Sequence, residues 1–259
     1  EAIEWITPEG SWLMAFLAVG FEQAPPQRYF FPLSFGWEAR NYDPAEAFGA
    51  WSFARVRYKD RVGIAYGAFG NPKFALSLVR AIAKPTEITL GARRQRFLPT
   101  SAYPQGLEMG EGDVKVPQLE QSNTSIFLGN RMHLKGYRLM HAGINPEVEV
   151  GRFLTEVSPY PHIARLLGTL EYVKENGEVE TLASLQEFVQ NQGDLWTYTL
   201  EYLERFLSTP PDGGAKAQES ATVHNAYLLQ SLKLGRRIGE LHAAFAVRSD
   251  DRAFAPEPA

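Results

Sequence analysis

Two Asn-Pro pairs limit the folds that this chain can adopt. Asn71-Pro72 and Asn145-Pro146 each follow strand-like residues and precede an apolar stretch with helical spacing. An Asn side chain caps the free N–H groups of a first helical turn, and Pro suits that turn because its φ angle is fixed. We expect one helix to begin after each pair and to end before Pro85 and Pro159. The segments around these helices have strand patterns, which predicts an α+β fold.

The segments around the first pair predict an antiparallel sheet. Strand-like residues occupy 12–19, 29–33, 62–69 and 86–98. A connection rich in Pro and Gly follows, with Pro99, Pro104 and Gly106 among its residues. We place a domain boundary in this connection, so that residues 1–105 form an N-terminal cap subdomain of a sheet with one helix on a face.

Residues 115–190 have the order strand, strand, helix, strand, strand. A Gly129-Asn130 turn joins the first two strands, and Asn176-Gly177 predicts a tight hairpin turn between the last two. Helical patterns follow at residues 195–207 and 222–245. This is the order of a kinase-like small lobe, then a hinge and the opening helices of a large lobe at residues 191–259.

Composition excludes several classes of protein. The chain has 26 Lys and Arg residues against 30 Asp and Glu residues, and no basic stripe that would neutralise a nucleic-acid backbone. The absence of cysteine excludes disulfides, thiolate metal sites and a cysteine nucleophile, and it fits a cytoplasmic protein. The longest apolar run, residues 12–21, is about half of what a membrane-spanning helix needs. We therefore expect neither a nucleic acid nor a membrane as a partner.

Three segments have residues suited to a nucleotide. Small polar residues in a turn present donors to phosphate oxygens, a strand lysine paired with a helix glutamate holds phosphates, and a strand end offers backbone groups to a base. The candidates are the turn Gln121, Ser122, Asn123, Thr124 and Ser125, the pair Lys135 and Glu149, and the strand end Glu187, Phe188 and Val189. Each also has an ordinary explanation: a solvated turn, a surface lysine with a glutamate favoured by the helix dipole, and any edge strand. The five histidines have no metal-ligand spacing, so no metal site is expected.

Ordered blocks along the second half of the chain resemble maltokinase. The resemblance covers residues 118–258 and reaches the first unit only in outline. Its blocks are Glu120 to Ser125, Leu134-Lys135, Gly143 to Glu156, Leu182 to Val189, Asn191 to Trp196, Leu234 to His242 and Phe254 to Pro258.

The resemblance implies an aminoglycoside-phosphotransferase-like fold and an activity. Such enzymes transfer the γ-phosphoryl group of ATP, with Mg²⁺, to maltose, and the maltose 1-phosphate feeds α-glucan (glycogen) synthesis. Many are fused to trehalose synthase. By position, Lys135 would bind phosphate with Glu149 as its partner, residues 121–125 would lie over the nucleotide, and residues 187–189 would form the hinge.

The chain departs from this family in its catalytic segments. The family's His-Gly-Asp and Asp-Phe-Glu segments occur nowhere in the sequence, so we expect them beyond residue 259 and expect the chain alone to be inactive. Two alternatives stay open. One is a non-enzymatic kinase-like scaffold or regulatory module, and the other is a different small-molecule phosphotransferase, because the absent lobe mainly sets the sugar acceptor.

Overall fold

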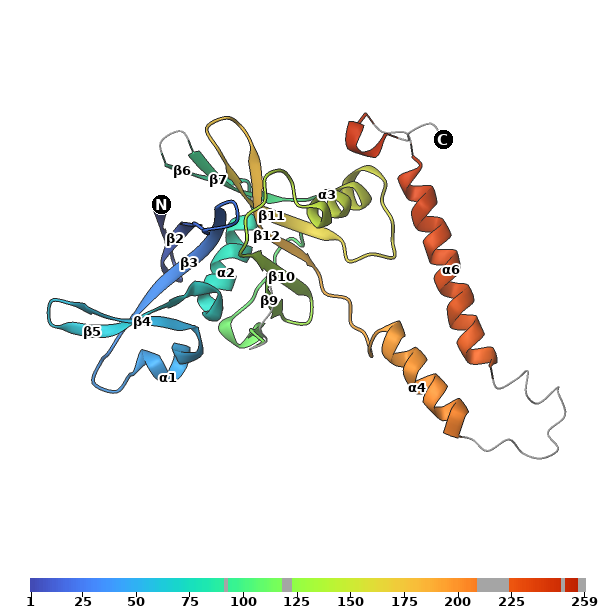
Figure 1. Ribbon diagram of the computed structural model, residues 1–259, viewed down its shortest axis with the longest axis horizontal. Helices are drawn as coiled ribbons and strands as arrows, with labels where there is room; N and C mark the ends of the chain where they lie inside the picture. The colour runs from blue at the N-terminus through green and yellow to red at the C-terminus, as the bar shows by residue number, and fades with distance from the viewer. Residues whose placement is uncertain (91–92, 118–122, 209–223, 248–249, 256–259) are drawn as a thin grey trace. The chain divides into compact units, whose positions relative to one another are not determined.

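The structure is a computed structural model that describes residues 1–90, 93–117, 123–208, 224–247 and 250–255. The chain forms two compact units. One unit comprises Glu1–Glu156 with Ala164–Phe188, and the other comprises Val157–Ile163 with Val189–Ala259. The first unit holds two antiparallel sheets and the second holds helices (Figure 1).

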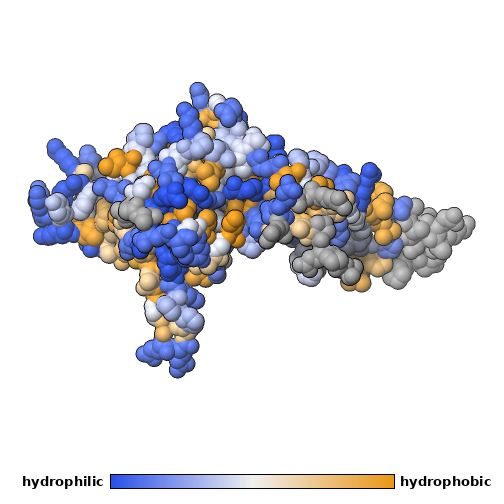
Figure 2. Space-filling model, turned by 90° about the horizontal axis from the view of Figure 1, so that it is seen from above, coloured by the Kyte–Doolittle hydropathy of each residue, from blue (hydrophilic) through white to orange (hydrophobic). Residues whose placement is uncertain are grey.

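Hydrophobic residues reach the surface in small patches between hydrophilic ones on the face shown in Figure 2. Within the described ranges, no helix is both long and apolar enough to cross a bilayer.

The first sheet of the larger unit has five strands. They are β1 (Ala2–Thr7), β2 (Gly10–Val19), β3 (Gln27–Trp37), β4 (Ser52–Tyr58) and β5 (Arg61–Gly67), in the spatial order β1-β2-β3-β5-β4. Helix α1 (Pro44–Phe48) lies between β3 and β4 in the chain. The strand-like segments at 12–19, 29–33 and 62–69 thus lie in or overlap β2, β3 and β5.

The second sheet has seven strands. They are β6 (Thr86–Leu90), β7 (Arg93–Pro99), β8 (Val114–Lys115), β9 (Asn123–Leu128), β10 (Met132–Tyr137), β11 (Leu166–Val173) and β12 (Val179–Glu187). Their spatial order is β6-β7-β11-β12-β10-β9-β8, and every neighbouring pair is antiparallel. Helix α3 (Pro146–Arg152), with a π-helical turn at Phe153–Val157, connects β10 to β11.

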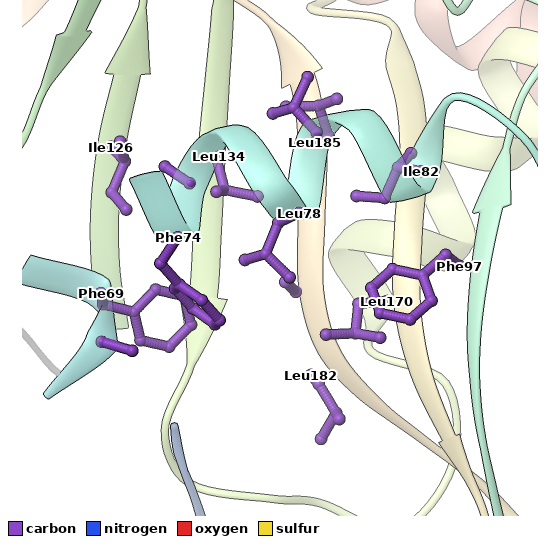
Figure 3. Packing of buried hydrophobic residues seen from close by; sticks show 14 of the residues in the cluster. Phe69, Phe74, Leu78, Ile82, Phe97, Ile126, Leu134, Leu170, Leu182 and Leu185 are labelled. Carbon is purple, nitrogen blue, oxygen red and sulfur yellow. The ribbon is translucent and has the colours of Figure 1, made fainter. Parts of the chain in front are cut away.

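Helix α2 (Pro72–Ile82) covers one face of the seven-stranded sheet (Figure 3). The Asn71 side chain caps its first turn by accepting a hydrogen bond from the Lys73 backbone N–H at 3.0 Å. Phe74, Leu78 and Ile82 recur every four residues, so they share one face, and all three are fully buried. They pack in one hydrophobic cluster with sheet residues that include Phe97, Ile126, Leu134, Leu170, Leu182 and Leu185.

The hairpin β6–β7 belongs to this second sheet. Strand β7 pairs with β11 from Gly168 opposite Pro99 to Val173 opposite Arg94. The strand pattern instead predicted a separate cap subdomain that ends at residue 105, between β7 and β11 in the chain. The difference has a physical reason: a strand pattern shows which residues are extended, but the partner strand, here about 75 residues away, is chosen by long-range packing.

The second unit contains α4 (Leu195–Ser208), α6 (Asn225–Phe245) and a short turn of 3₁₀ helix (Arg252–Phe254). The Tyr202 and Tyr227 rings stack with their centroids 4.4 Å apart, and the Tyr160 hydroxyl donates to the Arg237 carbonyl at 2.7 Å. The helical prediction for 195–207 is confirmed. That for 222–245 is confirmed from Asn225 on, and residues 222 and 223 lie outside the described residues.

Candidate functional site

Strand β10 presents different side chains to its two faces. Met132 and Leu134 are buried in the core that α2 covers, whereas His133, Lys135 and Tyr137 alternate with them and point to the opposite face. Gly136 lies on the core face, where a Cβ atom would come within 2.3 Å of the Phe69 ring. The core side of β10 is therefore tightly packed, and its chemistry-bearing residues all lie on the other side.

Helix α3 begins close to these residues because its cap is anchored to the sheet. The Asn145 side chain accepts a hydrogen bond from the Glu147 backbone N–H at 2.9 Å, and the Asn145 N–H donates to Thr181 Oγ1 at 3.1 Å. Val148 is fully buried, which fixes the rotation of the helix about its axis. The first turn of α3 thereby directs Glu147 toward β10.

The Glu147 carboxylate binds three side chains from two neighbouring strands. Lys135 Nζ donates to its Oε2 and Oε1 atoms at 2.8 and 3.0 Å, the Tyr137 hydroxyl donates to Oε2 at 3.0 Å, and Gln186 Nε2 donates to Oε1 at 3.2 Å. The side chain of Lys135 keeps 25% of its surface exposed. A fixed ammonium group with one accessible side is suited to binding an anion.

The contacts of Glu147 also determine its charge. Burial by itself would raise the pKa of the carboxyl, but the hydrogen bonds and charge of Lys135, with hydrogen bonds from Tyr137 and Gln186, lower the pKa below its usual 4.5. The pKa of His133 is lowered by burial and by the charge of Lys135, against the opposing effect of Glu147. At neutral pH the site therefore contains an ionised Glu147 and a neutral His133.

Aromatic rings gather beside the first residues of β10, which lie opposite the last residues of β12. The His133 ring stacks on Phe127 with centroids 4.8 Å apart and an interplanar angle of 18°, and Phe188 meets Phe127 edge-on at 5.4 Å. Within the described residues, the buried Nε2 atom of His133 has no hydrogen-bond partner.

The predicted hinge is partly engaged in other contacts. Glu187 is the last residue of β12 and pairs with Arg165, which lowers the pKa of its carboxyl. The backbone N–H of Phe188 donates to the Arg131 carbonyl at 2.8 Å. The chain passes between the two units after Glu156, after Ile163 and after Phe188, and the hinge role of residues 187–189 stays a prediction.

The predicted polar turn at 121–125 is a strand over its described part. Asn123, Thr124 and Ser125 belong to β9 and lie opposite Tyr137, Gly136 and Lys135. Gln121 and Ser122 lie outside the described residues. Ser125 is thus the cross-strand neighbour of Lys135, whereas Thr124 is buried.

The predicted pair of Lys135 with Glu149 is corrected by the structure, which pairs Lys135 with Glu147. Residues two positions apart on an α-helix are separated by about 200° around its axis, so Glu147 and Glu149 cannot both face β10. The burial of Val148 and the cap at Asn145 select Glu147.

The contacts of Glu147 with Lys135, Tyr137 and Gln186 were not predicted from the sequence. One signal was available for Tyr137, because residues i and i+2 of a strand share a face and Tyr137 follows Lys135 at that spacing. Gln186 becomes a neighbour only through the pairing of β10 with β12, where it lies opposite His133.

No protein-family model matches the chain. Among solved structures it is similar to glucosamine kinase in complex with glucosamine, ADP and inorganic phosphate, with a TM-score of 0.49, 18% identity, and 85% of this chain and 41% of that chain covered. Two further crystal forms of glucosamine kinase are similar with TM-scores of 0.47 and 0.46 and identities of 18% and 16%. They cover 86% of this chain in each case, and 41% and 43% of those chains. This chain thus spans about four tenths of the length of the structures it matches, and the assignment of a function depends on the geometry of the site.

Proposed function

We propose that this chain is the nucleotide-binding lobe of an ATP-dependent phosphotransferase that phosphorylates a small sugar. The observation that carries the proposal is the ion pair between Lys135 on β10 and Glu147 on α3. In protein kinases, a lysine on the third strand of the small lobe binds the nucleotide phosphates, and a glutamate on the helix after that strand positions it.

The position of the pair in the sheet supports the same proposal. Strand β10 follows β8 and β9, with which it forms consecutive antiparallel neighbours, and α3 lies between β10 and β11 in the chain. Strand β12 then inserts between β10 and β11 in the sheet. Counted along the chain from β8 to β12, which are five of the seven strands of this sheet, Lys135 is on the third strand and Glu147 is on the helix between the third and the fourth.

Lys135 has the donors that this role requires. An ammonium group has three N–H donors, and Glu147 accepts two of them at its two oxygens. One donor is left for a phosphate oxygen on the exposed side of Lys135. Because phosphoryl transfer depends mainly on positioning and charge stabilisation, a lysine held in this way contributes by fixing the phosphates and offsetting their charge.

Other contacts to the nucleotide are proposed from position. Ser125 lies on the same sheet face as Lys135 and is suited to a phosphate oxygen. The hinge residues Glu187, Phe188 and Val189 are proposed to border the base. Among the described residues, no three His, Asp or Glu side chains gather as metal ligands, and no step is assigned to Mg²⁺.

The sugar acceptor is proposed from the sequence resemblance. The ordered blocks between residues 118 and 258 favour maltose, with maltose 1-phosphate as the product for α-glucan synthesis and trehalose synthase as a fused or associated partner. Glucosamine and an aminoglycoside are the alternatives that a substrate panel separates.

Nucleotide binding and turnover test the proposal separately. Calorimetry with ATP and Mg²⁺ on this chain should show at most weak binding, because a small lobe supplies one wall of the nucleotide site, and Lys135→Ala should weaken it by about tenfold or more, because one charge-assisted contact is lost. Lys174→Ala is the matched control, since Lys174 forms strand-end ion pairs with Glu178 and Glu180. Equal nucleotide affinity in the wild type and Lys135→Ala would contradict the proposal.

This chain alone is expected to be inactive, so release of ADP is measured on a chain extended through the expected His-Gly-Asp and Asp-Phe-Glu segments, with each sugar of the panel, to identify the acceptor. Turnover with maltose alone supports the finer assignment, and turnover with another sugar changes the acceptor but retains the phosphotransferase. Lys135-dependent ATP binding with no turnover on any sugar would favour a kinase-like scaffold.

A further inference from the structure

We propose that Tyr137 is a positioning residue: its hydroxyl group, oriented by Ser184, holds the Glu147 carboxylate beside Lys135. The inference rests on the proposed nucleotide site and adds to it a residue that would not contact the nucleotide. It assigns to Tyr137 control over how well Lys135 is placed.

The contacts form a chain of four groups that begins deep in the sheet. Ser184 on β12 is fully buried, and its Oγ atom lies 3.0 Å from the Tyr137 hydroxyl oxygen. Tyr137 is 5% exposed, and its hydroxyl lies 3.0 Å from Glu147 Oε2. Lys135 Nζ contacts the same Oε2 atom at 2.8 Å. The lysine and the tyrosine thus bind one carboxylate oxygen from adjacent positions on one strand face.

The protons in this chain have a single consistent arrangement. An ionised carboxylate only accepts hydrogen bonds, and a phenol has one proton to donate. Tyr137 must therefore donate to Glu147, and the Ser184 hydroxyl must then donate to the Tyr137 oxygen. Ser184 orients the phenol proton, and Tyr137 delivers it to the carboxylate.

The tyrosine stays a donor over the physiological pH range. Burial raises the pKa of its hydroxyl well above the usual 10, the hydrogen bond with Ser184 opposes that change, and the neighbouring Glu147 charge adds to it. A phenol that remains protonated donates to Glu147 at any pH at which a kinase works.

Glu147 needs such a restraint because its side chain is partly exposed. With 37% of its surface accessible, the carboxylate has room to turn toward solvent. Gln186 restrains Oε1 and Tyr137 restrains Oε2, so each oxygen has a second donor besides Lys135. Groups held in the productive geometry before binding lose less entropy when the ligand arrives.

The test compares Tyr137→Phe with Tyr103→Phe. Both substitutions remove a phenol hydroxyl that makes a buried hydrogen bond, but the Tyr103 hydroxyl donates to the Val79 carbonyl at 3.0 Å, in the core with α2. Thermal unfolding midpoints establish that both variants fold. Two readouts follow: the titration of the Glu147 carboxyl by carbon NMR and the affinity for ATP with Mg²⁺ by calorimetry.

In Tyr137→Phe, the Glu147 pKa should rise toward its usual 4.5, because a hydrogen bond to the charged form is lost. The nucleotide affinity should fall about tenfold, as is typical when a residue that orients a binding group is removed. Ser184→Ala should act in the same direction but by only about two- to threefold, since Tyr137 keeps its proton and its bond to Glu147. Tyr103→Phe should leave both readouts at wild-type values.

If Tyr137→Phe and Tyr103→Phe have the same Glu147 titration and the same affinity, Tyr137 is not a positioning residue. If Lys135→Ala binds ATP as well as the wild type, the proposed function fails instead. The Glu147 titration needs no nucleotide, so in that case an unchanged pKa in Tyr137→Phe still overturns the positioning role and a raised pKa still supports it.

Discussion

Arg28 Nη1 lies 2.9 Å from Glu180 Oε2, which joins β3 of the five-stranded sheet to β12 of the seven-stranded sheet. Glu180 is almost fully buried, and it also pairs with Lys174 Nζ at 2.7 Å. Two backbone hydrogen bonds lie nearby, from Phe30 N–H to the Arg138 carbonyl and from Met140 N–H to the Arg28 carbonyl. The two sheets are thus connected by backbone and side chains within one compact unit.

Removing Arg28 should destabilise the larger unit. Arg28→Ala leaves the buried Glu180 carboxylate with Lys174 as its remaining cation, so we expect a loss of about 2 kcal/mol in the free energy of unfolding. Urea denaturation of the wild type, Arg28→Ala, Lys174→Ala and the double variant measures it. The double variant should lose more than the sum of the single losses, because only then does the carboxylate have no cation. Strictly additive losses would mean that the two cations act independently.

Gly168 should tolerate no side chain. A Cβ atom there would lie 2.3 Å from Ile82 Cγ2 and 2.6 Å from the Leu98 backbone oxygen, between α2 and β7. We expect Gly168→Ala to lower the free energy of unfolding by about 1–3 kcal/mol through overpacking. Gly49→Ala is the control, since Gly49 has open space around its Cβ position and an ordinary helical φ of −57°. Equal melting temperatures for the two variants would contradict the packing of α2 on β11.

The two glutamates of α3 should differ in their effect on nucleotide binding. Glu147→Ala removes the partner of Lys135 and should weaken ATP binding about tenfold, whereas Glu149→Ala should leave the affinity within about twofold of the wild type. Both substitutions remove one negative charge from the same helix, so a general change in electrostatics affects them equally. A larger loss in Glu149→Ala would restore the pairing that the sequence predicted.

Acid should remove the stabilising contribution of Glu147. Its pKa is lower in the folded chain than the usual 4.5, so the contribution is complete above about pH 4.5 and is lost as the pH falls through the folded value. At pH 7, Glu147→Gln should lower the free energy of unfolding by about 1–2 kcal/mol. Denaturant titrations should show this difference shrinking as the pH falls below 4.5. When Lys135 is replaced by Met, the effect of Glu147→Gln on the free energy of unfolding should be small both at pH 7 and below pH 4.5. If the effect in the wild-type background does not change with pH, the ion pair with Lys135 is not its source.

Local signals in the sequence predicted the helix caps and the turns, because these features depend on contacts between residues close together in the chain. Asn71 and Asn145 cap α2 and α3 through bonds to residues two positions on, as their Asn-Pro pairs predicted. The hairpin of β11 and β12 that Asn-Gly predicted is confirmed, with a φ of +83° at Gly177, but Asn176 does not have the positive φ of a tight primed turn. Turn and cap chemistry involves neighbours in the chain, so it can be read without knowing the fold.

Lys135 was one of the candidate site residues proposed from the sequence, but its surroundings depended on the tertiary structure. The capped start of α3 was predictable, whereas the rotation that presents Glu147 instead of Glu149 to β10 follows from the burial of Val148. The contacts of Gln186 and Ser184 arise from the register of β12 against β10.

The sequence by itself therefore determined the starts of α2 and α3, the positions of the turns and the α+β class, and it proposed Lys135 as a residue of the candidate site. Only the tertiary structure decided that β6 and β7 join the second sheet, that Asn123 to Ser125 are a strand, and which carboxylate Lys135 meets. The physical reason is the range of the interactions. Caps and turns are hydrogen bonds between residues a few positions apart, whereas strand register and helix rotation are set by packing between residues far apart in the chain.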